Sequence, residues 1–282
     1  MWTIRDIVCT GAAIIAGLAG LGLMRFIFID YFPPEVLIRD LQRSNIITAG
    51  MRRPAMVGYG TVALVMMAVF FKFVQQRWPG RGGVKGLVFG ASLGVVWSFG
   101  FLAGWAFLGT TLSTAFLNSV ADLIPLAFAG WLIGLAVGQD VPRSAHGTWR
   151  PWLAILFVAF GFVSVHTLGA RLFADHFAST ANLLLVPTTL LQIALLSGLG
   201  IWAGVMYVMI RIGLPFNKTW ARVAFFAFGV FGHCWTWFHV FFVIEFAGVL
   251  PTVLFVGLLG AAGVFAGALA YESLASGRRQ VD

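Results

Sequence analysis

The sequence has few charged residues and few cysteines, and each shortage excludes a class of protein. Only 10% of its 282 residues are charged, whereas a soluble domain carries about 25%. Hydrophobic residues make up 60% of the chain, and no long polar stretch remains for a separate soluble domain. We therefore expect an all-α integral membrane protein, because lipid accepts an apolar outer surface that water would not.

The two cysteines, Cys9 and Cys234, lie far apart inside apolar segments. No CxxC or Cys/His spacing accompanies them, so we predict neither a disulfide framework nor a metal site. The sequence also lacks GxSxG, Walker A and HExxH motifs, and its polar residues form no recognisable catalytic set. A role other than catalysis is therefore the better interpretation.

What the sequence does contain is a series of long apolar segments. Each is near or above the roughly 20 residues that a helix needs to cross a ~30 Å hydrocarbon core. We predict eight transmembrane helices joined by short loops. They lie near residues 7–30, 55–75, 85–112, 115–138, 151–173, 188–211, 220–247 and 250–272.

The basic residues indicate the orientation. Six of the 18 Lys and Arg residues lie on the side away from the termini, and the other twelve lie on the side of the termini. The six are Arg25, Arg39, Arg43, Arg52, Arg53 and Arg171. The positive-inside rule then predicts a multi-pass protein of the inner (cell) membrane with both termini cytoplasmic. The basic residues lie mostly between the apolar segments, so membrane orientation accounts for the net charge of +8. We therefore expect the lipid bilayer and other membrane subunits as partners, and no nucleic acid.

The two halves of the chain share a pattern. Five residues of the second span match five residues of the sixth span at one offset of 140 residues, and the loop lengths agree. They are Gly58, Gly60, Ala63, Val65 and Met66, matched with Gly198, Gly200, Ala203, Val205 and Met206. We predict two parallel four-helix repeats, residues 1–142 and 143–282, related by a pseudo-twofold axis along the membrane normal, an arrangement known among transporters.

The loops at 31–54 and 174–187 are too long for simple turns. In the first, apolar and charged residues alternate after Pro33-Pro34, which predicts a short amphipathic helix at the outer interface. That helix would either cap a cavity or rest on lipid. Arg171 and Glu245, near span ends, are predicted to extend toward the interface.

Ionisable residues at membrane depth cost roughly 2.5–3.5 kcal/mol each on insertion scales, so each requires a reason. Asp122 and Asn118 share one helix face, and Pro125 follows them. Helix rise places Arg25, His166 and His239 in the same outer half of the membrane. These five residues predict a polar transport site between the repeats. The alternative is that Asp122 pairs with Arg25 or Arg171 and only joins helices.

A second candidate site lies in the aromatic-rich segment 232–239. His233 and His239 are six residues apart, so they point about 120° apart on a regular helix and cannot bind one metal together. Each could instead pair with His166 on another helix. With Trp235 and Trp237, the three histidines predict a haem or another flat ligand such as a quinone. Hydrogen bonds across helices are the alternative role.

Three functions follow from these features. The first is a transporter of a small solute or ion, with proton coupling through Asp122. The second is a haem- or quinone-associated subunit, or an accessory protein, of an electron-transfer complex. The third is a structural or assembly subunit that acts through helix contacts alone.

Overall fold

The computed structural model describes residues 2–27, 41–142, 150–176 and 186–278. Every regular element in these ranges is a helix, and eight spans are long and apolar enough to cross a membrane. The predicted all-α membrane fold is therefore confirmed. Six of the spans are single helices: α1 (Ile4–Ile27), α3 (Arg52–Val74), α4 (Gly82–Leu108), α5 (Leu112–Val137), α6 (Pro151–Phe173) and α10 (Leu250–Arg278).

The other two spans are composite. The sixth is α7 (Leu190–Ile210), which ends in the 3-10 turn η3 (Arg211–Gly213). The seventh consists of α8 (Thr219–Ala224), the π-helix η4 (Phe225–Phe231) and α9 (Gly232–Glu245). Outside the spans, the short helix α2 (Asn45–Thr48) precedes α3. The seventh span thus differs from the single regular helix that the sequence predicts over 220–247.

Local chemistry explains where the helices end. The predicted helix over 85–112 stops at Leu108, because Gly109 adopts a φ of 73° that glycine tolerates best. The hydroxyl of Thr111 then accepts the backbone N–H of Thr114 and starts α5. Thr189 and Gln192 form a reciprocal capping box at the start of α7.

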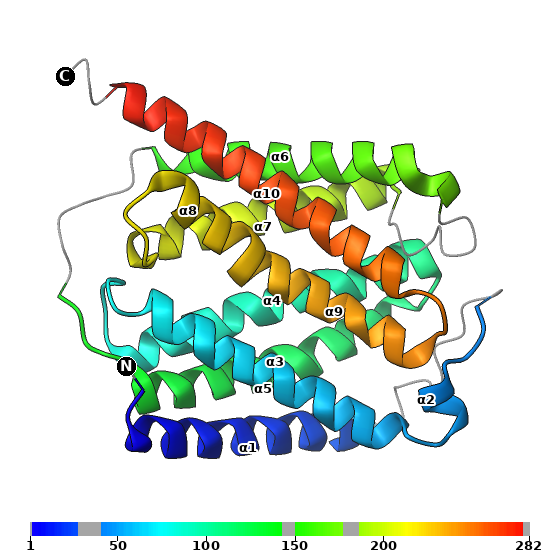
Figure 1. Cartoon of the computed structure of the whole chain (residues 1–282). Coiled ribbons are helices and arrows are strands. Elements are labelled where there is room, and N and C mark those ends of the chain that lie inside the picture. Colours follow the sequence, from blue (N-terminus) through cyan, green and yellow to red (C-terminus); the bar gives the residue numbers. More distant parts are fainter. Residues whose placement is uncertain (1, 28–40, 143–149, 177–185, 279–282) are drawn as a thin grey trace.

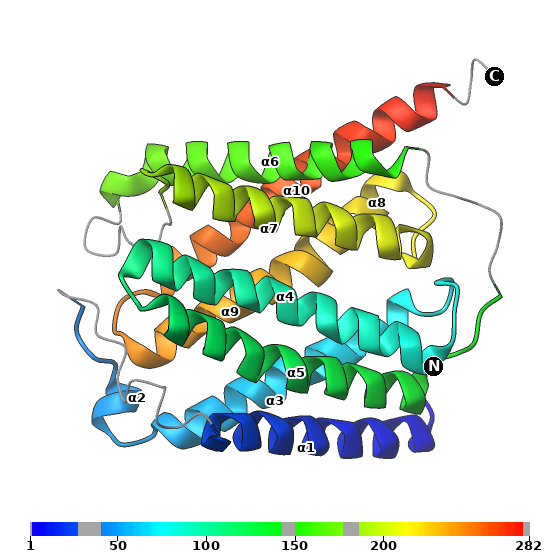
Figure 2. The ribbon, with the colours of Figure 1, turned by 180° about the vertical axis from the view of Figure 1, so that it is seen from behind.

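The spans form two layers, which Figures 1 and 2 show from opposite sides. One layer contains α3, α8–α9 and α10, and the other contains α5, α4 and α7. At the two edges, α1 packs on α5 and α3, while α6 packs on α10 and α7. Both chain ends lie on one face of the bundle, here named the terminal face, as an even number of spans requires.

Small residues bring the helices together. In α4, Gly82, Gly86 and Gly90 lie directly against α5, where Gly130 and Gly134 expose their backbone. A Cβ atom on Gly86 would lie only 2.6 Å from the Cα of Gly134. Helices approach this closely in lipid because dispersion between backbones drives their association. The glycine spacing in α5 therefore serves contacts within the chain.

The two halves occupy comparable positions. In both views α1 and α6 lie at opposite edges, and α4 and α9 lie near the centre, one in each layer. This placement is compatible with an axis that runs between α4 and α9. The internal duplication itself, with its boundary near residue 142, stays a prediction.

The loop after the first span is attached to the other half of the chain. The backbone N–H of Ser44 donates to the carbonyl of Glu245 at 3.1 Å, and that of Ala247 donates to Gln42 at 3.0 Å. The Ser44 hydroxyl donates to the carbonyl of Ile244. Residues 41–51 thus pack on the end of α9, whereas residues 31–40 and 177–185 of the two long loops lie outside the described ranges.

Candidate functional site

The predicted polar residues of the first half do come together. Arg25 of α1 donates to the carboxylate of Asp122 at 2.6 Å and also to the side-chain oxygen of Asn118. Asn118 in turn donates to the carbonyl of Thr114, one turn earlier in α5. Asp122 is buried, and the arginine compensates its charge. This geometry favours the helix-joining alternative, because a carboxylate held by a guanidinium is poorly placed to bind a second cation.

The histidines predicted to face each other are each packed against aromatic rings. Nδ1 of His239 lies 2.8 Å from the carbonyl of Trp235 on its own helix, and its ring meets the Trp235 ring edge-on at 4.3 Å. His166 of α6 stacks on Phe162, and Phe162 contacts Trp235. A chain of rings therefore joins the two histidines, and this packing favours a structural role over haem ligation. Across the described ranges, no cluster of three or more His, Cys, Asp or Glu residues could hold a metal ion.

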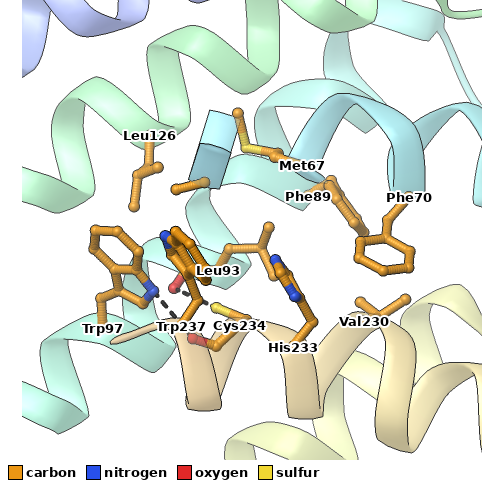
Figure 3. Close-up of a pocket in the computed structure, with 11 residues that line it drawn as sticks. Met67, Phe70, Phe89, Leu93, Trp97, Leu126, Val230, His233, Cys234 and Trp237 are labelled. Atoms are coloured by element: carbon orange, nitrogen blue, oxygen red, sulfur yellow. Dashed lines mark hydrogen bonds between the residues drawn. The ribbon is translucent and has the colours of Figure 1, made fainter. Parts of the chain in front are cut away.

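The third histidine, His233, lines a pocket (Figure 3). Most of the lining residues lie near the middle of their spans, so the pocket is at mid-depth in the bundle. The free space at its centre is about 20 Å³, enough for one or two water molecules. Residues of α3, α4, α5 and the seventh span surround it, so it lies between the two halves of the chain. They are Ala63, Met67, Phe70, Phe89, Leu93, Trp97, Leu126, Val230, His233, Cys234 and Trp237.

Most polar side chains around the pocket are already engaged. Trp97 donates to the carbonyl of Cys234 at 3.3 Å, and the Cys234 thiol donates to the carbonyl of Leu93 at 3.7 Å. Figure 3 shows both interactions. Trp237 donates to the carbonyl of Tyr59 at 3.1 Å. Nε2 of His233, by contrast, is buried and has no hydrogen-bond partner in the described part of the chain.

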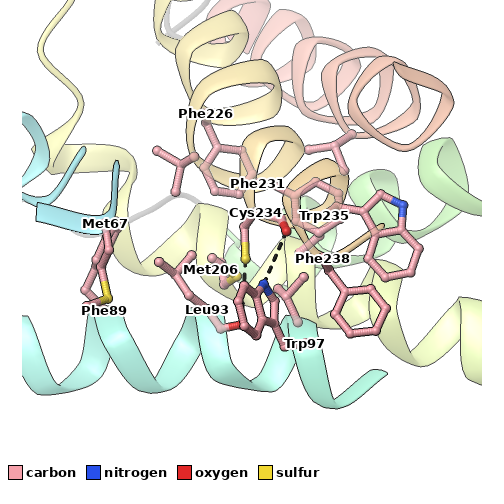
Figure 4. Close-up of a cluster of buried hydrophobic side chains, with 14 of the residues drawn as sticks. Met67, Phe89, Leu93, Trp97, Met206, Phe226, Phe231, Cys234, Trp235 and Phe238 are labelled. Carbon is pink, nitrogen blue, oxygen red and sulfur yellow. Dashed lines mark hydrogen bonds between the residues drawn. The ribbon is translucent and has the colours of Figure 1, made fainter. Parts of the chain in front are cut away.

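The His233 ring is held between two other rings. It stacks on Trp237, with centroids 5.9 Å apart and an interplanar angle of 18°, and it leans on Phe70 at 5.5 Å. Phe231, Trp235 and Phe238 of the same span belong to the buried hydrophobic cluster drawn in Figure 4. The orientation of the imidazole is therefore fixed by its neighbours.

The backbone beside the pocket is irregular. The π-helix η4 ends at Phe231, two residues before His233, and it supplies Val230 to the lining. π-helical turns are rare and occur often at functional sites. Here the wider turn precedes the segment that presents His233 and Cys234 to the pocket.

Two ion-pair networks, which the sequence did not locate, hold the helix ends. On the face opposite the termini, Glu245 is 1% exposed and is bound by Arg43 at 3.0 Å and Arg52 at 2.7 Å. The expectation that Glu245 extends toward the interface is therefore wrong, because two arginines of the other half neutralise it inside the protein. Arg171 is exposed, as predicted.

On the terminal face, Glu272 of α10 accepts a hydrogen bond from Tyr207 at 2.6 Å and forms a bidentate ion pair with Arg211. All three residues are buried. The signal for Glu272 in the sequence was a carboxylate at the last residue of the predicted eighth span. Its partners lie more than 60 residues away, so only the fold identifies them.

No protein-family model, curated protein or solved structure matches this chain. The eight long apolar helices give it the architecture of a multi-pass α-helical membrane protein.

Proposed function

We propose that this protein is a membrane carrier for a small uncharged solute, which it binds in the pocket beside His233. The observation that carries this proposal is the position of the pocket. It lies at mid-depth, between helices of the two halves, and next to the one π-helical break in the described spans. Carriers built from two halves bind their substrates near the bilayer midplane, where a helix is interrupted.

The charges support an uncharged solute rather than an ion. Asp122 and Glu245, two buried carboxylates in the membrane-spanning region, are each neutralised by arginine. The pocket lining contains no Asp, Glu, Lys or Arg. Proton coupling through Asp122 therefore has less support than binding at His233.

The chain offers its own probe for this proposal. Cys234 lines the pocket, and the other cysteine, Cys9, lies on α1. A carrier must open its pocket to water on each side in turn, and a thiol reacts as thiolate, which forms in water and not in an apolar interior. In the Cys9→Ser variant, a membrane-impermeant methanethiosulfonate is added to either side of sealed proteoliposomes.

We expect Cys234 to react from both sides in the folded protein, at rates that differ between the two sides. The matched control is Cys234→Ser, which keeps Cys9 alone and measures labelling outside the pocket. If Cys234 reacts only after denaturation, the bundle does not open to water. The protein would then be a structural subunit, and the carrier proposal would be refuted.

A further inference from the structure

The end of α3 meets the segment that joins α7 to α8 on the terminal face, so the two halves of the chain are in contact there (Figure 1). A Cβ atom on Gly213 would lie 2.3 Å from the carbonyl oxygen of Val74, so a glycine is needed for this backbone approach. Beyond it, Arg77 donates to the side-chain oxygen of Asn217 at 3.4 Å. The two segments are therefore held side by side at this junction.

Two positive charges at the junction lack a carboxylate partner. Arg77 and Lys218 are exposed, and neither forms an ion pair in the described part of the chain. Lys218 directly follows the asparagine that Arg77 binds. Of the carboxylates on this face, Asp6 and Glu272 bind other basic residues, and Asp140 accepts a backbone N–H. The junction therefore offers positive charge to a partner outside the chain.

Exposed aromatic side chains accompany these charges. Phe73 of α3 and Phe216 of the joining segment both contact the ring of Phe225 edge-on, with centroids 6.1 and 5.5 Å away. Trp220 lies in the first turn of α8, two residues after Lys218, and is exposed. Tryptophan is enriched where a membrane meets water, at the level of the lipid headgroups. We name the residues Phe73, Arg77, Phe216, Lys218 and Trp220 the junction surface.

The chemistry of the junction surface restricts its partner. Arginine and lysine bind phosphate oxygens, and arginine can do so through two parallel hydrogen bonds. The exposed rings add an apolar surface, which the acyl chains of a lipid cover in a membrane. A zwitterionic headgroup would bring its own positive charge toward two cations, whereas a headgroup with a net negative charge complements them. An anionic phospholipid therefore matches both parts of the surface.

We infer that one anionic phospholipid binds at the junction surface, with its phosphate on Arg77 and Lys218 and its acyl chains against the three aromatic rings. Because Arg77 belongs to the first half of the chain and Lys218 to the second, the lipid joins the two halves on the terminal face. The inference does not depend on the proposed function, since lipid binding here involves neither the pocket nor its opening to water.

The test is native mass spectrometry of the full chain in a neutral detergent, which counts bound lipids and measures their dissociation constants. Delipidated protein is titrated with dioleoyl phosphatidylglycerol and, separately, with dioleoyl phosphatidylcholine. We expect the first phosphatidylglycerol to bind more tightly than the first phosphatidylcholine. Arg77→Gln and Lys218→Gln should each weaken binding of this phosphatidylglycerol about 5-fold, the effect of one basic residue near an anionic lipid surface.

The matched control is Arg5→Gln, which removes an exposed positive charge from the same face, but on α1 at the edge of the bundle. It should leave the dissociation constant unchanged, and thermal unfolding checks that all three variants fold. Equal weakening by all three variants, or by none of them, would overturn the site. Equal affinity for the two lipids would overturn the need for a negative headgroup.

A final measurement separates a lipid from a free anion. Inorganic phosphate, added at the same concentration as the lipid, should not displace phosphatidylglycerol, because it makes no contact with the aromatic rings. Displacement would show that the junction surface binds phosphate without acyl chains, and the assignment to a phospholipid would then be wrong.

Discussion

Replacement of Glu245 by glutamine should destabilise the protein, because its carboxylate binds Arg43 and Arg52 and so attaches the segment between them to the end of α9. The carboxylate is 1% exposed and binds Arg43 and Arg52, whose side chains are 22% and 38% exposed. Loss of one partner from a fully buried ion pair costs about 3–5 kcal/mol, whereas an exposed pair contributes about 0–1 kcal/mol. Both arginines can regain water, so we expect an intermediate loss of about 2 kcal/mol.

The assay is thermal unfolding in detergent, followed by the intrinsic fluorescence of the 11 tryptophans. At about 2–4 °C per kcal/mol for a chain of 150–250 residues, Glu245→Gln should lower the melting temperature by about 4–8 °C. The matched control is Asp175→Asn, which removes an exposed carboxylate near the same face and should leave the melting temperature within about 1 °C.

A double-mutant cycle locates the effect. If the ion pair accounts for the loss, Arg52→Gln should cost much less in the Glu245→Gln background than in the native protein. A Glu245→Gln variant that melts with the native protein would refute the reasoning. It would mean that the backbone hydrogen bonds from Ser44 and Ala247 alone hold the loop in place.

Three further changes test the packing. Gly86→Ala should lower the free energy of unfolding by about 2–3 kcal/mol, since its Cβ would meet the α5 backbone. Gly22→Ala has nothing within 4 Å of the added Cβ and should be neutral or stabilising. Denaturant titration of both variants compares their free energies of unfolding. Asp122→Asn should reduce the melting temperature because it breaks an ion pair, yet leave labelling of Cys234 from water unchanged, and altered labelling would restore Asp122 to the transport site. Tyr207→Phe should cost about 1–3 kcal/mol by thermal unfolding, because a buried hydrogen bond to the charged Glu272 is lost.

The spans could be predicted well because length and apolarity are local properties of the sequence. Their boundaries were less exact: the helix predicted over 85–112 runs from Gly82 to Leu108, since one glycine in a left-handed conformation ends it. The π-helix could not be predicted. Its sequence, FFAFGVF, is apolar on every side and therefore carries no periodicity that would separate a π-helix from an α-helix.

The candidate site could be predicted only in part, because ion pairs join residues far apart in the chain. The sequence brought Arg25, Asn118 and Asp122 to the same depth, and they do meet. It gave no reason to pair Glu245 with Arg43, 202 residues away. An acidic residue at a span end looks the same in sequence whether it reaches water or an arginine of another loop.

Asp122 and His233 differ as candidate binding residues in whether the fold already supplies a partner for the buried side chain. A charged residue in a membrane span is a candidate functional residue because its burial there is costly. For the same reason the fold supplies a partner of opposite charge, as Arg25 does for Asp122. An uncharged imidazole costs less than a charge when it is buried without a hydrogen bond, so its nitrogen can stay available to a ligand. In this protein the buried carboxylates therefore join helices through arginine. Among the residues that line the pocket, the buried side-chain nitrogen without a hydrogen-bond partner in the described ranges is Nε2 of His233, beside the π-helix.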